Sequence, residues 1–266
     1  VLGSAVGQDK VIMKEILEYE HVPMVPWFFV YSNDITNTYK DIEAKAEMIG
    51  YPLIIKPANL GSSIGIEIVH KKDELKSALS ECAKYDDKLV IEKMVKQLKE
   101  VNISVMGNSK DAKVSAIEEV MKGDEFLSFS NKYLGGGKGT KGSKPTKVAP
   151  TKGSKGMASA SRIVPARLDG NQQKEIEEYA LKSFKALNAS GAVRIDFMID
   201  KEDGSVYVNE INSIPGSLAF YLWKEVGVDF REECDLLINN ALNVYREKKK
   251  KVRSFDTNIL SNYKEN

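Results

Sequence analysis

The sequence of 266 residues is poor in the residue types that most often report redox or metal chemistry, with two cysteines and two histidines. Cys82 and Cys234 do not make a disulfide framework, and their spacing is not that of a zinc site. The sequence also lacks any run of 18 or more apolar residues, so it predicts no membrane-spanning helix. Since no signal peptide is visible at its start, we expect a cytoplasmic protein without a membrane partner.

An excess of charge of one sign is absent as well. The 39 Lys and Arg nearly balance the 38 Asp and Glu, which leaves a net charge of +1. No global field therefore favours nucleic acid as a partner. The length allows one large domain or two smaller ones. Because the chain begins at Val1 and enters a helix pattern almost at once, we expect that an N-terminal region is missing.

Helix and strand patterns alternate along the chain and predict an α+β fold. Residues 1–97 form a first predicted unit, with helices over 9–19, 38–49 and 72–84 and strands over 27–31, 53–56, 64–69 and 89–93. Residues 98–247 form a second unit, with strands over 101–106, 114–120, 192–199 and 205–211 and helices over 171–188 and 229–247. The remaining residues, 248–266, begin with a run of lysines and predict a charged, solvated tail.

A basic, glycine-rich segment interrupts the second unit. The segment from Lys132 to Arg167, both included, contains nine Lys or Arg and no Asp or Glu. This composition cannot form a packed core, so we expect a long loop over residues 134–160. The loop either closes as a lid over phosphates or is a tolerated surface insertion. Binding of nucleic acid is disfavoured, because Tyr133 is the only aromatic residue available there to stack on a base.

A predicted hairpin gathers polar residues in the second unit. Glu202-Asp203-Gly204 fits a three-residue loop with Gly204 in the left-handed region. That register sets Lys201 opposite Ser205. Because side chains alternate along a strand, it also brings four polar groups onto one face. They are Arg194 opposite Asn212 and Asp196 opposite Glu210.

Two carboxylates side by side repel by about 4 kcal/mol at an effective dielectric near 20, so a further group must hold them. One hypothesis pairs Arg194 with one acid and raises the pKa of the other. The alternative is a hard cation, because carboxylate and amide oxygens are how proteins usually hold magnesium. Asp196, Glu210 and Asn212 supply that set.

Two further segments of the first unit fit a nucleotide. The glycines of residues 61–65, after the strand that ends at Lys56, allow backbone N–H groups to approach phosphate. This loop is not a Walker A sequence, and a plain turn between strands fits it equally well. The apolar strand around Glu92 offers backbone groups to an adenine edge, and Glu100 offers a carboxylate to ribose hydroxyls. An edge strand with solvated acids is the alternative.

Seven segments, in this order and spacing, resemble the D-alanine–D-alanine ligases of the ATP-grasp superfamily. They are GSAVGQDK, IIKPANLGSSIGI, LVIEKMV, NKYLGGGKG, KGMASASRIVPA, AVRIDFMID and VNEINSIPGS. The last two are the most specific. The resemblance implies that residues 1–97 are a nucleotide-binding subdomain and residues 98–247 a catalytic subdomain. In that fold the two α+β subdomains grip ATP between two antiparallel sheets.

The resemblance also implies roles by matching position. Residues that would bind ATP are Lys10, Lys56 and Lys132 at the phosphates, Glu92, Met94 and Val95 at adenine, and Glu100 at ribose. Residues that would hold two Mg²⁺ ions, or Mn²⁺ in their place, are Asp196, Glu210 and Asn212. Residues that would act on the substrates are Ser62 and Tyr133, which orient them, and Arg194 and the backbone N–H of Gly216, which stabilise an oxyanion.

The implied reaction joins the carboxylate of one D-alanine to the amine of a second D-amino acid through an acyl phosphate, for peptidoglycan. Its partners are small molecules, and a homodimer is among the arrangements it allows. Three alternatives remain. A related ligase would take D-lactate, D-serine or a peptide amine, because Tyr221 stands where the family usually has serine. An ATP-grasp module would bind nucleotide without chemistry. A basic-loop protein would bind a polyanion in a salt-sensitive way.

Overall fold

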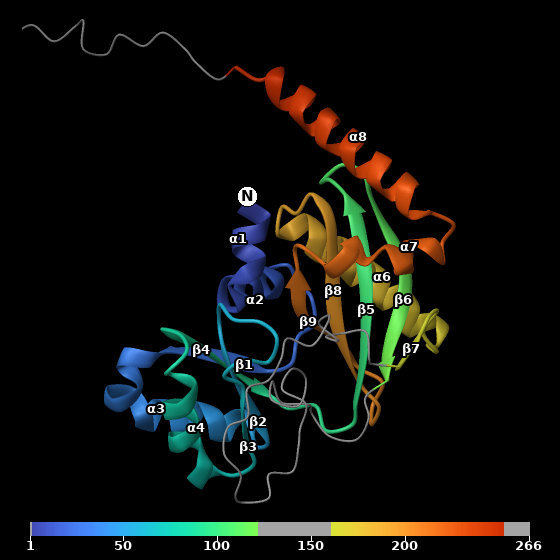
Figure 1. Ribbon diagram of the computed structural model, residues 1–266. Coiled ribbons are helices and arrows are strands. Elements are labelled where there is room, and N and C mark those ends of the chain that lie inside the picture. The colour runs from blue at the N-terminus through green and yellow to red at the C-terminus, as the bar shows by residue number, and fades with distance from the viewer. Residues whose placement is uncertain (1, 122–160, 253–266) are drawn as a thin grey trace, which may run out of the picture.

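The computed structural model describes residues 2–121 and 161–252 and contains two antiparallel sheets, each packed against helices (Figure 1). The sheets fall within the two predicted units, so the expected α+β architecture with two antiparallel sheets is confirmed. Lys132, Tyr133 and the predicted loop 134–160 lie outside the described residues, as does the tail from residue 253 onward.

Sheet A belongs to the first unit and has the strand order β1-β4-β2-β3. Its strands are β1 (Trp27–Tyr31), β2 (Leu53–Pro57), β3 (Glu67–Val69) and β4 (Lys88–Lys93). Helices α3 (Ile35–Ile49) and α4 (Leu75–Cys82) pack on it, and Leu53, Ile55 and Leu79 are fully buried in their shared core. Gly50 ends α3 with φ 80°, and its N–H bonds the carbonyl of Ala46. Glycine suits this positive φ because it has no Cβ.

Sheet B belongs to the second unit and has the order β7-β6-β5-β8-β9. Its strands are β5 (Leu98–Gly107), β6 (Ala112–Met121), β7 (Ser161–Ile163), β8 (Gly191–Asp200) and β9 (Val206–Asn212). Helix α6 (Gly170–Ala186) begins after Asp169, whose carboxylate caps two backbone N–H groups. Its apolar side, with Ile176 and Phe184 fully buried, covers one face of the sheet. The opposite face is thereby left for polar side chains.

Helix α2 (Lys10–Tyr19) joins the two sheets. Asp9 caps it by accepting hydrogen bonds from the N–H groups of Val11 and Ile12. Met13 and Leu17 are buried in the sheet B core, whereas Val11 packs with residues of sheet A. The helix α1 (Leu2–Gln8) precedes it. Side chains of α2 therefore reach both units.

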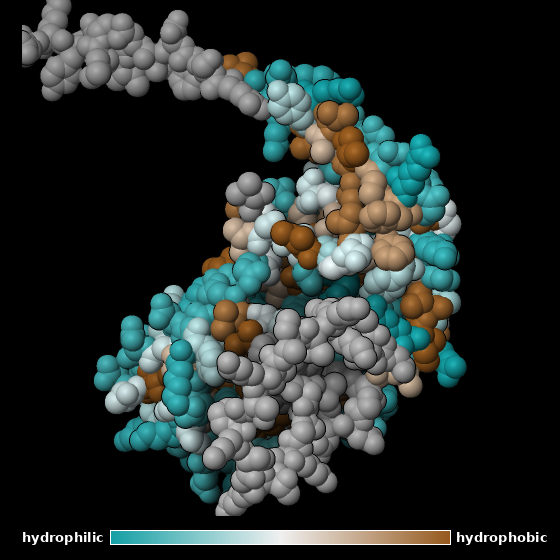
Figure 2. Space-filling model, in the orientation of Figure 1, coloured by the Kyte–Doolittle hydropathy of each residue, from teal (hydrophilic) through white to brown (hydrophobic). Residues whose placement is uncertain are grey.

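Helices α7 (Phe220–Lys224) and α8 (Phe230–Lys249) follow sheet B, and α8 extends away from it (Figure 1). Figure 2 shows apolar side chains gathered along α8. Its exposed apolar residues are Phe230, Leu236, Ile238, Leu242 and Tyr245. Among residues 2–121 and 161–252, no helix combines the length and the apolarity needed to cross a bilayer.

Glu233, in the first turn of α8, is a buried acid. Neither of its carboxylate oxygens has a hydrogen-bond partner within the described part of the chain. Burial raises its pKa from 4.5 to about 7. The folded protein therefore keeps a proton on Glu233 at pH values where the unfolded chain has lost it.

This proton predicts a pH-dependent stability. Between about pH 4.5 and 7 the folded state binds more protons than the unfolded state, so the free energy of unfolding falls as pH rises and then levels off. We expect Glu233→Gln to remove this fall, whereas Glu232→Gln, at the exposed neighbouring position, leaves it in place. Urea unfolding from pH 5 to 8 measures the difference. Parallel profiles for the wild type and Glu233→Gln would contradict it.

Candidate active site

The hairpin of β8 and β9 has a longer turn than the sequence predicts. The N–H of Asp200 bonds the carbonyl of Ser205 at 3.0 Å, and the N–H of Gly204 bonds the carbonyl of Asp200 at 2.8 Å. Asp200, not Lys201, therefore lies opposite Ser205, and the predicted turn register is wrong. The loop holds four residues, because Asp200 keeps its place in the ladder.

A β-bulge corrects the register before the polar residues are reached. Asn209 is the extra residue, inserted where the ladder shifts between Asp196 and its neighbour in β8. Beyond it, Asp196 lies opposite Glu210 and Arg194 opposite Asn212. The predicted pairing of these four residues is confirmed, although by a different route from the one expected.

The polar row continues across the sheet. Asn102 of β5 lies opposite Asp196 on one side and opposite Glu118 of β6 on the other. Partners that face each other in an antiparallel ladder point to the same side of the sheet. Four strands therefore present a continuous row of oxygen-bearing side chains, in the order Glu118, Asn102, Asp196 and Glu210. This row lies on the face opposite to the apolar core.

Arg194 and Asp196 form a two-point ion pair. Nε of Arg194 lies 2.7 Å from Oδ1 of Asp196, and Nη2 lies 2.8 Å from Oδ2. Arg194 is only 7% exposed. Burial raises the pKa of Asp196 to about 6, because it outweighs the opposite effect of Arg194, and the nearby Glu210 adds to the rise. The hypothesis that Arg194 pairs with one of the two acids is therefore confirmed for Asp196. The raised pKa, however, belongs to this paired acid itself.

The donor set is also suited to a hard cation. The side chain of Glu210 is 40% exposed, and Asp196 beside it carries a raised pKa. A cation between the two carboxylates would offset the cost of burying the charge of Asp196 and would reduce the repulsion between them. Within the described residues, no three His, Cys, Asp or Glu gather as a complete metal cage. Two carboxylates and an amide, completed by phosphate and water, are instead the set that Mg²⁺ takes.

Lysines from the first unit approach this row. Nζ of Lys56 donates to Oδ1 of Asn209 at 3.1 Å, and Nζ of Lys10 lies 3.9 Å from Oε2 of Glu210. Lys56 is at the end of β2 and Lys10 at the start of α2, as the sequence places them. The bulged residue of β9 therefore bridges to sheet A. These contacts bring basic groups of one unit against acidic groups of the other.

The side chain of Glu92 lies between two lysines rather than in solvent. Oε2 is 2.5 Å from Nζ of Lys56, and Oε1 is 2.7 Å from Nζ of Lys14. Burial opposes ionisation of Glu92, but Lys14 and Lys56 together lower its pKa to about 2. Sequence reasoning missed Lys14. The available signal is its position four residues after Lys10 and three before Leu17, on the buried stripe of α2.

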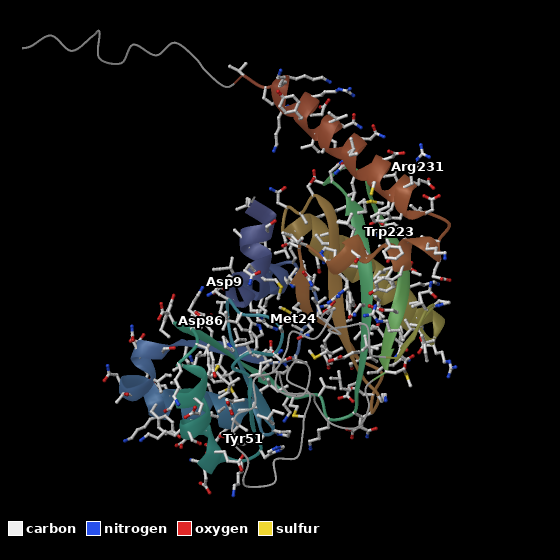
Figure 3. The ribbon with its side chains drawn as sticks, in the orientation of Figure 1. Asp9, Met24, Tyr51, Asp86, Trp223 and Arg231 are labelled. Carbon is white, nitrogen blue, oxygen red and sulfur yellow. The ribbon has the colours of Figure 1, made fainter. Side chains whose placement is uncertain are left out.

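A second charged contact ties the start of α2 to sheet A. The carboxylate of Asp9 pairs with Lys88 at the start of β4. Oδ2 of Asp86 accepts a hydrogen bond from the N–H of Asn59 at 2.6 Å, and its Oδ1 accepts from the N–H of Lys88. Asp9 and Asp86 lie close together in Figure 3. These contacts fix the end of the helix at which Lys10 stands.

The two loops that carry Ser62 and Gly216 contain unusual backbone. Ser62 and Ser63 have φ of 56° and 61°, and the three residues after Gly216 have φ of 51° to 61°. Residues other than glycine seldom adopt this left-handed region, and such strain clusters at functional loops. At Gly65, φ is 68° and an added Cβ would lie 2.8 Å from the Tyr85 ring. The turn therefore requires glycine there.

A polar cluster at the other end of the row was not predicted. Oε1 of the fully buried Glu118 accepts hydrogen bonds from Tyr221 Oη at 2.7 Å and Asn102 Nδ2 at 3.0 Å. The guanidinium of Arg162 lies 4.9 Å from the centre of the Tyr221 ring and 3.5 Å from Oε2 of Glu118. Burial and the bond to Glu118 raise the pKa of Tyr221. The sequence singled out Tyr221 only through its place in the family pattern.

The residues expected at the base and ribose lie where the two units join. The N–H of Met94 bonds the carbonyl of Pro52 at 3.1 Å. Val95 is buried with Val25 and Met198. Glu100 of β5 lies opposite Met198 of β8. Met94 and Val95 follow directly after β4, on the connection that leads from sheet A into sheet B, and Glu100 lies near the start of β5.

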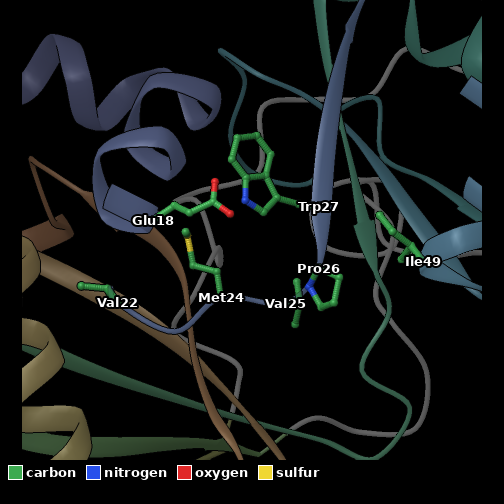
Figure 4. A pocket seen from close by; sticks show the side chains of 7 residues that line it. All are labelled: Glu18, Val22, Met24, Val25, Pro26, Trp27 and Ile49. Carbon is green, nitrogen blue, oxygen red and sulfur yellow. The ribbon is translucent and has the colours of Figure 1, made fainter. Parts of the chain in front are cut away.

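A separate pocket of about 300 Å³ borders the connection between α2 and β1 (Figure 4). Its lining residues are Glu18, Val22, Met24, Val25, Pro26, Trp27 and Ile49. None of the predicted ATP-binding side chains is among them. The pocket therefore borders the expected adenine site only through Val25, which packs with Val95.

Two antiparallel sheets, with lysines from one unit against carboxylates from the other, define an ATP-grasp fold. The chain belongs to the family described as D-ala D-ala ligase C-terminus, whose model matches residues 16–239. The D-alanine–D-alanine ligase of Thermosipho africanus is 38% identical over 262 residues, which cover 97% of this chain and 64% of the relative. The chain thus spans just under two thirds of that relative's length.

Solved structures give the same family. The VanG D-Ala:D-Ser ligase from Enterococcus faecalis superposes with a TM-score of 0.70 at 26% identity, covering 90% of this chain and 63% of that one. The D-alanine–D-alanine ligase from Bacillus anthracis complexed with ATP superposes with a TM-score of 0.67, also at 26% identity, covering 93% and 70%. The fold of this chain is therefore shared with ligases whose names give different second amino acids, D-serine in one and D-alanine in the other.

Proposed function

We propose that this chain binds ATP and catalyses the joining of two D-alanines, as the ATP-binding and catalytic part of a D-alanine–D-alanine ligase. One observation carries the proposal. Lys10 and Lys56 of the first unit contact Glu210 and Asn209 of the second, so cations suited to phosphate stand beside carboxylates suited to a metal. The family membership of the chain supports the same reaction. Because the reaction consumes ATP, we place the chain in the cytoplasm, where ATP is available.

ATP would lie with its phosphates toward Lys10, Lys56 and Lys132. The adenine would meet the segment from residue 92 to 95, chiefly through backbone groups and Val95, because the Glu92 side chain is held by lysines. Glu100 would accept the ribose hydroxyls. Asp196, Glu210 and Asn212 would hold Mg²⁺, with Mn²⁺ as a substitute. Bound magnesium would neutralise charge that develops on the phosphates.

The chemistry has two steps. A carboxylate oxygen of the first D-alanine attacks the γ-phosphorus, the bond to the bridging oxygen breaks, and ADP leaves with that electron pair. The amine of the second substrate then attacks the acyl phosphate, loses a proton, and phosphate leaves. Arg194 and the N–H of Gly216 would stabilise the tetrahedral oxyanion that forms when the amine adds to the acyl phosphate, before phosphate leaves. Ser62 and Tyr133 orient the substrates.

The acceptor is the least constrained part of the reaction. Tyr221, where the family usually has serine, is held by Glu118 and lies under Arg162. This cluster favours a second candidate function, a ligase that takes D-serine, D-lactate or a peptide amine as acceptor. A nucleotide-binding module without chemistry is disfavoured, because binding alone does not require the buried pair of Arg194 and Asp196. A panel of acceptors with product mass spectrometry separates these functions. A homodimer remains a prediction.

The first test is ATP binding. Replacing Lys56 with methionine removes a charge-assisted contact to phosphate, worth about 1.5–3 kcal/mol. We therefore expect the affinity for ATP with magnesium to fall roughly ten- to 150-fold in titration calorimetry. Lys76→Met is the matched control, because Lys76 is an exposed lysine that lies over the Tyr39 ring in the same unit. Unchanged affinity in Lys56→Met would contradict the phosphate site.

A further inference from the structure

Lys14 is a fully buried cation to which the sequence analysis assigned no role. It is 0% exposed, in the second turn of α2. Its Nζ lies 2.7 Å from Oε1 of Glu92 and 5.6 Å from the centre of the Trp27 ring. Burying an ammonium group is costly unless a partner compensates. Glu92 is that partner.

Glu92, however, has two cations rather than one. Its other oxygen, Oε2, lies 2.5 Å from Lys56, which is only 8% exposed. The three side chains therefore carry a net charge of +1. With Glu92 and Lys56 alone, the charges would cancel, and Lys56 would be part of a closed neutral pair.

We propose that Lys14 is a positioning residue that neutralises Glu92, so that Lys56 stays a net positive charge available to the phosphates of a nucleoside triphosphate. This inference rests on the proposed ATP-binding function. Glu92 meanwhile remains an anchor, because one of its oxygens holds the end of Lys56. Asn209 holds the same ammonium group from the side of sheet B at 3.1 Å. Lys56 is thus fixed in place without its charge being cancelled.

Stability alone does not explain the arrangement. Well-packed apolar residues in place of a buried ion pair or triad are often neutral or stabilising, so the fold has no need of three charges here. An anion-binding site does need them. Charge effects are strongest where water is excluded, and Lys14 and Glu92 are both almost completely buried. The low pKa of Glu92 is consistent with an acid that stays ionised beside both lysines.

Four forms of the chain test the proposal by titration with ATP and magnesium. They are the wild type, Lys14→Met, Glu92→Gln and the double variant Lys14→Met/Glu92→Gln. Lys14→Met should weaken ATP binding at least about tenfold, equal to 1.4 kcal/mol. The double variant should regain an affinity within about threefold of the wild type, since its net charge is again +1. Glu92→Gln alone keeps both lysines but loses the charged anchor of Lys56, so it should bind ATP more tightly than Lys14→Met.

The controls separate charge from folding. Thermal unfolding of each form establishes that it is folded at the titration temperature, and Lys76→Met, an exposed lysine in the same unit, should bind ATP like the wild type. In steady-state assays, the KM for ATP should rise in Lys14→Met more than kcat falls. A packing role for Lys14 would instead leave the double variant as weak as the single one.

The outcomes are distinct. Wild-type affinity in a folded Lys14→Met, or failure of the double variant to recover, would overturn the inference and leave the proposed function standing. If Lys14→Met does not fold, the double variant decides alone: wild-type-like affinity supports the charge account, and an affinity about tenfold weaker overturns it. A wild-type chain that binds no ATP would overturn the proposed function itself, and the inference with it.

Discussion

Replacing Arg194 with methionine is expected to slow dipeptide formation by about 10²–10³-fold, the usual loss when one oxyanion donor is removed. Arg194 is held along one edge of its guanidinium, through Nε and Nη2, by Asp196, so it is oriented before any substrate arrives. The variant also leaves Asp196 buried without its cation, which raises the pKa of Asp196 further. ATP binding should decline less than turnover, because Lys10 and Lys56 remain.

The measurement is D-alanine-dependent release of phosphate and dipeptide, followed separately. Arg194→Lys keeps the charge but loses the two-point contact, so it should recover only part of the rate. Arg246→Met is the matched control, since Arg246 is an exposed arginine of α8 that donates a hydrogen bond to Asn243 at 3.4 Å. Its rates should equal those of the wild type. Dipeptide formation by Arg194→Met at more than half the wild-type rate would rule out the oxyanion role.

Trp223→Ala is expected to destabilise the protein by about 3–5 kcal/mol, the range for truncating a large buried aromatic side chain. Trp223 is 1% exposed in α7, and its Nε1 donates to Oγ of Ser104 at 3.0 Å. Ser104 in turn donates to the carbonyl of Val193, so the ring sits on β5 beside the polar row (Figure 3). Alanine would leave both a cavity and an unused acceptor on Ser104.

Chemical unfolding monitored by circular dichroism measures the loss. Trp223→Phe should cost only about 1–2 kcal/mol, because it retains most of the packing and loses mainly the hydrogen bond. Phe230→Ala, at a half-exposed aromatic position of α8, should change stability by about 0.5 kcal/mol or less. A Trp223→Ala variant as stable as Phe230→Ala would show that α7 contributes little to the fold.

Much of the fold was predictable because local sequence patterns determine where its helices and strands begin and end. The helices that start at Lys10 and Gly170 have aspartate caps and buried stripes, and α3 ends at a glycine. Helix α1 was not predicted, since its glycines disfavour a helix on propensity. In the structure Gly3 packs so closely on the carbonyl of Asn188 that an added Cβ would lie 2.7 Å away. That contact joins distant parts of the chain, so no local sequence pattern predicts it.

The site was predictable in part for the same reason. Alternation along two adjacent strands was enough to group Asp196 with Glu210, although the turn was wrong by one residue and the bulge went unseen. Glu118 and Lys14 were missed, because each acquires its partner only when separate elements meet. A glutamate in a strand and a lysine in a helix are ordinarily solvated, and only burial makes them part of a site.

The bulge at Asn209 has a consequence for chain length. From Tyr207, which pairs with Met198, to Glu210 there are three steps, an odd number that in a regular strand would send the two side chains to opposite faces. The bulge absorbs the extra step. A chain lacking Asn209 would therefore keep Glu210, Asn212 and their partners on the same face, and would lose only the bridge to Lys56. By contrast, one residue inserted between Asn209 and Glu210 makes four steps. A strand without a bulge would then keep the carboxylate on the same face but set it opposite Arg194, and only a second bulge would keep it opposite Asp196. The hairpin tolerates a deletion at this point far better than an insertion.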